Sequence, residues 1–293
     1  MGSMTESSVK LPIIRSFRER FAQSVLYFVV LLVSASFAWI LFDLTHGGIG
    51  HLSIDFLVDM PRDAGRSGGI GSILISTAFI LLIALAAALP LGWATAALLT
   101  EYLPPSGSFG RTIRYSLLVL AAVPSIIFGL FGNAFFSIYL GMGFSILSGG
   151  LTLACMLLPI LVTTAEAGLR AAPVSYRLSA AALGMSRTAT LCHVLFPVAV
   201  PALVAGLLLG IGRALAETAA LLFTSGYVDR MPGSLLDSGR TLAMHIYDLS
   251  MNVPGGDASA YASALVLIIV LLFINIIAIR LAAGWRSRTI MPE

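Results

Sequence analysis

The sequence predicts an all-α integral membrane protein with six transmembrane helices, and three observations support this prediction. Of the 293 residues, 58% are hydrophobic and 11% are charged, whereas soluble domains carry about a quarter charged residues. The mean hydropathy is +0.97. The chain also contains six apolar runs near the length of about 20 residues that a helix needs to cross a bilayer, at residues 21–43, 71–99, 115–140, 145–164, 197–224 and 259–283.

The basic residues indicate how these helices are oriented. The N-terminal flank, the loops at 100–114 and 165–196 and the C-terminal end hold 12 of the 17 Lys and Arg residues. The opposite loops hold four basic and eight acidic residues, and Arg213 lies inside the fifth run. Because short cytoplasmic flanks are enriched in Lys and Arg, we expect both termini to be cytoplasmic. The basic charge thus reflects orientation in a lipid bilayer, and nothing indicates nucleic-acid binding.

The apolar runs also divide the chain. We interpret residues 1–3 as an expression scar, and residues 4–70 as a cytoplasmic flank, the first transmembrane helix and an external loop. Residues 71–283 are expected to form the main transmembrane domain, with residues 165–196 as its long cytoplasmic loop. Residues 284–293 then form a cytoplasmic tail.

Several motifs of catalytic and metal-binding proteins are missing from the sequence. There is no phosphate-binding P-loop, no HExxH, no GxSxG nucleophile elbow and no cluster of Cys and His. Cys155 and Cys192 provide neither a disulfide framework nor the spacing of a metal site. We therefore expect no enzymatic activity, no metal site and no cofactor in this chain, so that any energy-consuming step requires another chain.

The 165–196 loop has the pattern of a short surface helix. Pro173 favours the start of a new helix, the stretch VSYRLSAAALG is rich in alanine, and Gly184 is typical of the position after a helix C-terminus. Small side chains allow another protein to approach closely. This pattern favours a protein contact over the alternative of an amphipathic helix that lies on the bilayer.

The alanines, the following glycine and the later proline resemble the EAA loop of ABC importer permeases. In that family the loop forms the coupling helix, which docks in a groove of the cytoplasmic ATPase. The sequence departs from the motif at its glutamate position, Leu178, and at its first alanine position, Ser179. The resemblance implies an ATPase-coupling loop that includes Arg170, Pro173, Arg177, Leu178, Ala180, Leu183 and Gly184.

Five further segments narrow the resemblance to the PstA family of phosphate ABC importer permeases. They are GGIGSILISTAFILLIALAAALPLGWATAALLTEY (68–102), VPSIIFGLFG (123–132), TTAEAGLRAAPVSYR (163–177), GRALAETAALLFTSG (212–226) and TLAMHIY (241–247). The resemblance covers about residues 68–280. It implies a type I ABC importer permease fold with a cytoplasmic coupling helix, in the plasma (inner) membrane of a bacterium.

The resemblance also implies an assembly. A PstC-like permease subunit would complete the channel, two copies of a PstB-like ATPase would bind ATP and Mg, and a PstS-like protein would deliver inorganic phosphate. This chain would then form half of the translocation path. The near alternatives are the PstC-like half or a permease for another oxyanion, such as sulfate or molybdate. A more distant alternative is an ion-coupled secondary carrier.

Two charges lie within the fifth apolar run. Arg213 and Glu217 are four residues apart, so a continuous helix would place them on one face. Charges in a membrane helix are costly and usually face a protein interior or an aqueous path. We consider three roles: an ion pair that packs the bundle, an anion-attracting site at Arg213 with Glu217 holding its side chain when the path is empty, and a proton relay. The anion site is favoured because guanidinium donors match phosphate oxygens.

The third run adds two polar candidates for the substrate path. Ser125 and Asn133 lie in the otherwise apolar stretch VPSIIFGLFGN. They would either line the path or form hydrogen bonds that pack the helices.

Overall fold

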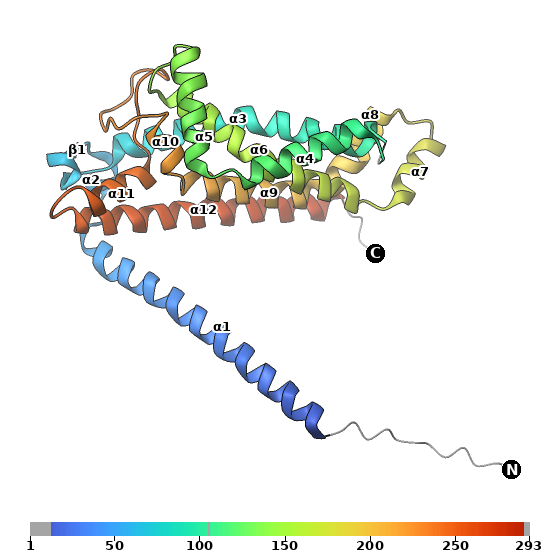
Figure 1. Ribbon diagram of the computed structural model, residues 1–293, viewed down its shortest axis with the longest axis horizontal. Helices are drawn as coiled ribbons and strands as arrows, with labels where there is room; N and C mark the ends of the chain where they lie inside the picture. The colour runs from blue at the N-terminus through green and yellow to red at the C-terminus, as the bar shows by residue number, and fades with distance from the viewer. Residues whose placement is uncertain (1–12, 105, 290–293) are drawn as a thin grey trace. The chain divides into compact units, whose positions relative to one another are not determined.

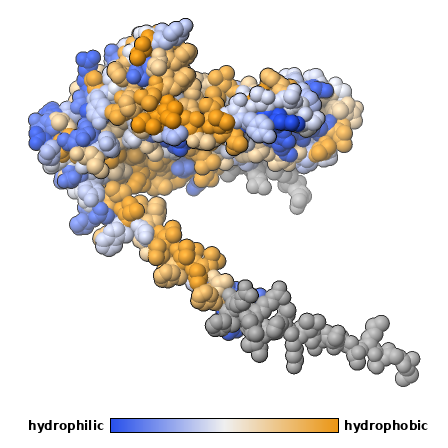
Figure 2. All heavy atoms as spheres, in the orientation of Figure 1, coloured by the Kyte–Doolittle hydropathy of each residue, from blue (hydrophilic) through white to orange (hydrophobic). Residues whose placement is uncertain are grey.

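The computed structural model describes residues 13–104 and 106–289, and the described chain is almost entirely helical. It divides into two units, Met1–Gly47 and Gly48–Glu293. The first unit contains most of α1 (Ile13–Gly48), which includes the predicted span 21–43. Most of its large apolar side chains from Phe21 to Phe42 form an apolar surface along the helix (Figure 2). The predicted scar at 1–3 and the last four residues of the predicted tail lie outside the described ranges.

The second unit contains the other helices and one small hairpin. The elements at one end of this unit are η1 (Ile49–His51), α2 (Ile54–Val58), β1 (Pro61–Arg62), η2 (Asp63–Gly65), β2 (Ser67–Gly68) and α11 (Leu242–Met251). The longer helices are α3 (Gly71–Ala97), α4 (Ser108–Ala122), α6 (Ile146–Ala171), α9 (Phe196–Leu215) and α12 (Asp257–Thr289). The remaining elements are η3 (Leu98–Tyr102), α5 (Ser125–Gly132), η4 (Asn133–Tyr139), α7 (Val174–Ala182), α8 (Arg187–Thr190), η5 (Leu191–Leu195) and α10 (Ala219–Leu222).

Helix α6 forms the centre of this unit. It packs against α3 on one side and α9 on another, and α12 packs against α9 (Figure 1). Ile80, Leu153, Leu157 and Leu161 are almost completely buried in the shared core. Close helix contact depends on small residues, because a β-carbon built at Gly206 of α9 would overlap the Thr164 hydroxyl of α6. The predicted spans 71–99, 145–164 and 259–283 are thus confirmed as parts of α3, α6 and α12.

The third predicted span, 115–140, is not a straight helix. Helix α4 and the α5–η4 segment meet at an angle of 103°. Pro124 explains the break, because its ring disfavours helical geometry at the preceding residue, and Val123 is extended with ψ 127°. Among the described residues, five helices are long and apolar enough to cross a membrane, and this bent pair makes a sixth if it counts as one span.

The fifth predicted span, 197–224, is also interrupted. The helix begins earlier, at Arg187, and ends at Leu215. The short helix α10 starts only at Ala219. Most of the predicted loop 165–196 is helical as well, because α6 continues to Ala171 and α7 and α8 follow.

Polar residues gather at two opposite ends of the second unit. One end carries the β1–β2 hairpin, in which Pro61 pairs with Gly68 and Arg62 with Ser67. The other end carries α7 and α8 (Figure 1). On the visible face, apolar side chains occupy the region between these two polar ends (Figure 2). This distribution fits a body embedded in a bilayer.

Candidate functional site

The surface helix predicted from the 165–196 loop is present as α7. Ala172 is extended with ψ 130°, as expected before a proline, and Pro173 is the N-cap of the helix. Gly184 adopts φ +75°, a left-handed conformation that glycine enters without steric cost. The amides of Gly184 and Met185 donate to the carbonyls of Ala181 and Ala180, both at 3.0 Å, and close the helix. The predicted start and end of this helix are therefore confirmed.

Helix α7 and the residue after it expose apolar side chains on more than one side of the helix. Leu178 and Leu183 are 66% and 81% exposed, and Val174 and Tyr176 are exposed as well. Ala180, by contrast, is buried against the rest of the unit. An exposed apolar surface at a polar end of the molecule is typical of a protein contact.

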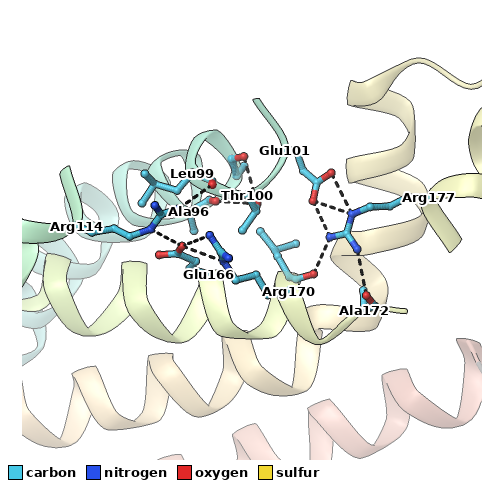
Figure 3. A network of polar contacts seen from close by, with 11 residues as sticks. Ala96, Leu99, Thr100, Glu101, Arg114, Glu166, Arg170, Ala172 and Arg177 are labelled. Carbon is cyan, nitrogen blue, oxygen red and sulfur yellow. Dashed lines mark hydrogen bonds and ion pairs between the residues drawn. The ribbon is translucent and has the colours of Figure 1, made fainter. Parts of the chain in front are cut away.

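Arg177 fixes α7 to two other elements (Figure 3). Its Nη2 lies 2.7 Å from Oε1 of Glu101, and its Nε donates to both carboxylate oxygens at 3.2 and 3.3 Å. The same guanidinium donates to the carbonyl of Leu169, at 2.9 Å, and to that of Ala172, at 3.1 Å. Arg177 therefore joins η3, the end of α6 and α7 through charge-assisted hydrogen bonds.

A second charged group lies nearby, on the inner side of this junction (Figure 3). Oε1 of Glu166 accepts from Nε of Arg114 at 2.9 Å and from Nε of Arg170 at 3.0 Å. Arg114 also donates to the carbonyl of Leu99 at 3.1 Å. Glu166 thereby connects α4 and α6, and Arg114 connects both to η3. The predicted coupling residue Arg170 is thus held by its own helix and does not contact α7 in the described structure.

The two partly buried carboxylates, Glu101 and Glu166, were not among the predicted site residues. Glu101 and Glu166 both lie in the segments that carry the family resemblance. Each lies just after a predicted apolar run, and an arginine follows it further along the chain. This position was the signal that the sequence offered for a paired carboxylate. Their pairing could not be predicted, because it depends on how α3, α4, α6 and α7 pack together.

The predicted geometry of Arg213 and Glu217 is wrong. Helix α9 ends at Leu215, so the two residues do not share one helical face. Glu217 is buried, and its Oε1 accepts from the amide of Ala220 at 3.2 Å. Arg213 is exposed and forms no ion pair or side-chain hydrogen bond with any part of the chain that the structure describes.

The capping contact explains why the helix stops at this point. A carboxylate that binds a nearby amide offers the backbone an alternative to helical hydrogen bonding. Glu217 supplies this bond to the start of α10, while the amide of Glu217 itself bonds only three residues back, to Ala214 at 3.3 Å. Glu217 therefore stabilises the interruption between α9 and α10, and it does not bind the Arg213 side chain.

Ser125 and Asn133 lie at the start of α5 and of the wide turn η4. Both side chains are partly exposed, and neither makes a hydrogen bond to a residue within the described ranges. The packing role considered for them thus has no hydrogen bond to support it. Helix α5 itself is tightly packed on α10, since a β-carbon at Gly129 would lie 2.9 Å from the Cα of Ala220.

Comparisons with known proteins identify this architecture. Residues 88–289 match the family model described as the binding-protein-dependent transport system inner membrane component. The probable ABC transporter permease protein YqgI of Bacillus subtilis is 31% identical over 84% of this chain and 87% of its own length. The phosphate transport system permease protein PstA of Mycobacterium leprae is 34% identical, over 74% of this chain and 71% of its own.

Solved structures show the same fold. A chain of a bacterial ABC transporter involved in the import of the acidic polysaccharide alginate aligns with a TM-score of 0.59 at 14% identity, over 91% of this chain and 99% of that one. A chain of the methionine ABC transporter MetNI gives a TM-score of 0.57 at 17% identity, over 74% and 94% of the two chains. The chain therefore belongs to the family of binding-protein-dependent transport system inner membrane components, and it has the type I ABC importer permease fold.

Proposed function

We propose that this chain is the permease subunit of an ATP-driven importer and forms half of a translocation path for inorganic phosphate. The observation that supports phosphate is the similarity to permeases named for phosphate transport, which extends over about three quarters of this chain. The break after α9 supports a path near Arg213, because transporter substrate sites often lie at interrupted helices.

Arg213 is the proposed anion-attracting residue. An exposed guanidinium on an apolar helix is costly in hydrocarbon. In the membrane, the Arg213 side chain must therefore face an aqueous path or another subunit. It has no anionic partner within the described chain, and its donors are therefore available to phosphate oxygens. Ser125 and Asn133, whose side chains make no hydrogen bond within the described residues, are proposed as further path residues.

The proposed assembly contains a PstC-like permease subunit, two copies of a PstB-like ATPase and a PstS-like phosphate-binding protein. ATP and Mg would bind to the ATPase, and this chain would hydrolyse nothing. The exposed apolar side chains of α7 support docking of the ATPase, with Leu178 taking part through apolar contact where the motif usually has glutamate.

The proposed orientation follows from this docking. The α7 end would face the cytoplasm, both termini would be cytoplasmic, and the hairpin end would face outward across the bacterial inner membrane. Arg170 and Arg177 at the α7 end agree with the enrichment of basic residues on the cytoplasmic side.

The test is transport by the assembled complex. The chain is co-expressed with its genomic neighbours, purified with a P-loop ATPase and reconstituted into vesicles that contain ATP. We expect uptake of radiolabelled phosphate that excess sulfate or molybdate does not inhibit. Uptake of sulfate or molybdate without phosphate would contradict the proposed substrate, and failure to purify with an ATPase would contradict the proposed function altogether.

A further inference from the structure

Two consecutive residues at the end of α3 hold the segment between α6 and α9 at two places. Glu101 binds Arg177 on α7, as described above. The hydroxyl of the next residue, Tyr102, lies 3.0 Å from the hydroxyl of Thr188 on α8. Both contacts therefore reach the α7–α8 segment from η3, the wide π turn that ends α3.

The Glu101–Arg177 contact is stronger than an ordinary surface ion pair. The Glu101 side chain is 13% exposed and that of Arg177 is 27% exposed. The geometry is bidentate, which restricts both distance and orientation. Exposed pairs contribute little because water competes with them and their side chains are mobile. This pair is shielded and held by further bonds from Arg177 to the carbonyls of Leu169 and Ala172 at the end of α6.

The contact connects α7 to the central packing of the membrane domain. η3 follows α3 without interruption, and α3 packs along α6. Beyond Pro90, Ala96 and Leu99 are buried in a core cluster with residues of α6. The segment that carries Glu101 is thus packed on α6, so that a displacement at Glu101 acts directly on the packed helices. Single π turns such as η3 occur frequently at functional sites.

We propose that Glu101 is a positioning residue that transmits movement of α7 to α3 through its bidentate contact with Arg177. Glu101 contacts neither nucleotide nor substrate in this role. The inference rests on the proposed function, in which α7 is moved by an ATPase. It adds the residue pair through which that movement reaches the helices around the translocation path.

The experiment compares transport with ATP hydrolysis in the reconstituted complex. The variants are Glu101→Gln, Arg177→Gln and the exchange Glu101→Arg with Arg177→Glu. We expect both Gln variants to assemble and to hydrolyse ATP, while phosphate imported per ATP hydrolysed falls about tenfold or more, because each variant loses at least one charge-assisted hydrogen bond. The exchange variant should recover part of this ratio. Its recovery is incomplete because Glu at 177 cannot donate to the α6 carbonyls.

Arg111→Gln is the matched control. Arg111 is an exposed arginine on α4 and has no ion pair or side-chain hydrogen bond within the described chain. Its loss should leave the transport ratio unchanged. If the Gln variants do not assemble, Arg177→Lys provides the comparison, since it keeps the charge and removes the bidentate geometry.

An unchanged ratio in Glu101→Gln, or in Arg177→Lys where the Gln variants do not assemble, would overturn the inference. So would equal losses in Glu101→Gln and the Arg111→Gln control. These results are distinguishable from failure of the proposed function, in which the wild-type complex itself imports no phosphate. If the wild-type complex imports another oxyanion, the same ratios are measured with that ion.

Discussion

Arg240 and Asp248 form an ion pair in which Nη1 lies 3.1 Å from Oδ2, and both residues are more than nine-tenths buried. The guanidinium also donates to the carbonyl of Tyr227 from Nε and Nη2, at 3.1 and 3.0 Å, and lies 4.9 Å from the centre of the Tyr227 ring. Asn252 donates to Asp248 at 2.9 Å. This group fastens the long loop before α11 to α11 itself.

Removal of one member of this pair should be strongly destabilising. In Arg240→Met or Asp248→Leu, the remaining charge is buried without its partner, at a cost of about 3–5 kcal/mol. The double variant leaves no unpaired charge and should lose less than the two single losses combined. The measurement is thermal unfolding of the purified protein in detergent. Additive losses would contradict this account.

His245 should make the stability depend on pH. Burial, and then the charge of Arg240, lower the pKa of His245 to about 4, while Asp248 opposes the shift. From the hairpin, the neighbouring residue is Gly65, which carries no charge. The unfolded state binds the proton near pH 6.5, so between about pH 6.5 and 4 the unfolded state holds more protons. Stability should therefore fall over this range by on the order of 3 kcal/mol.

The check is the unfolding temperature at pH 7 and pH 5 for wild type and His245→Gln. Glutamine keeps an acceptor for Arg240, whose Nη1 lies 3.4 Å from Nδ1 of His245. The variant should show a smaller decrease in acid. If both proteins lose the same stability, the pH dependence originates from other groups.

The packing of α9 on α6 gives a third prediction. Gly206→Ala places a methyl group against Thr164 and should destabilise the protein by about 1–3 kcal/mol through overpacking. Gly212→Ala is the matched control, because nothing lies within 4 Å of a β-carbon at that position of the same helix. Its stability should be unchanged or slightly higher, since alanine favours a helix more than glycine. Unfolding temperatures in detergent test the difference, and equal effects would contradict it.

Glu217 should act on stability as a cap. Glu217→Ala removes the acceptor for the Ala220 amide and should cost about 1 kcal/mol. Glu217→Gln keeps an acceptor and removes a buried charge, so its stability should equal or exceed that of wild type. The same unfolding measurement compares the three proteins. A glutamine variant as unstable as the alanine variant would show that the charge itself is required.

Replacement of Arg213 should affect transport, whereas replacement of Glu217 should affect stability. Arg213→Gln should leave assembly and ATP hydrolysis intact, because the side chain makes no bond to the described chain, and should abolish phosphate uptake. Reconstituted vesicles report all three properties. Normal uptake by a correctly assembled Arg213→Gln complex would remove Arg213 from the path.

The membrane helices and α7 could be predicted because their signals are local. Apolar length identifies α3, α6 and α12, and Pro173 with Gly184 delimits α7. The interruptions were harder to predict. Val123 is itself apolar, and an apolar stretch resumes directly after Glu217 and Thr218, so hydropathy averaged over a span does not distinguish one helix from two. Pro124 provided a local signal for the first break, but the second depends on a side-chain cap.

In the candidate site as well, local sequence signals identified single residues but not their distant partners. Arg177 could be selected from its place in a recognisable motif, whereas its partner Glu101 is 76 positions earlier in the chain. Similarly, Arg213 and Glu217 were paired because of their spacing, and that inference assumed a continuous helix. Contacts between distant segments are determined by tertiary packing, which a single sequence does not specify.

The double attachment of the α7–α8 segment also constrains how its length can change. Arg177 and Thr188 are both held by adjacent residues of η3, so the chain between them must close a loop of fixed span. An insertion or deletion there would release one attachment or distort the turn at Gly184. Variation in loop length among related chains should therefore be tolerated outside these two positions and avoided between them.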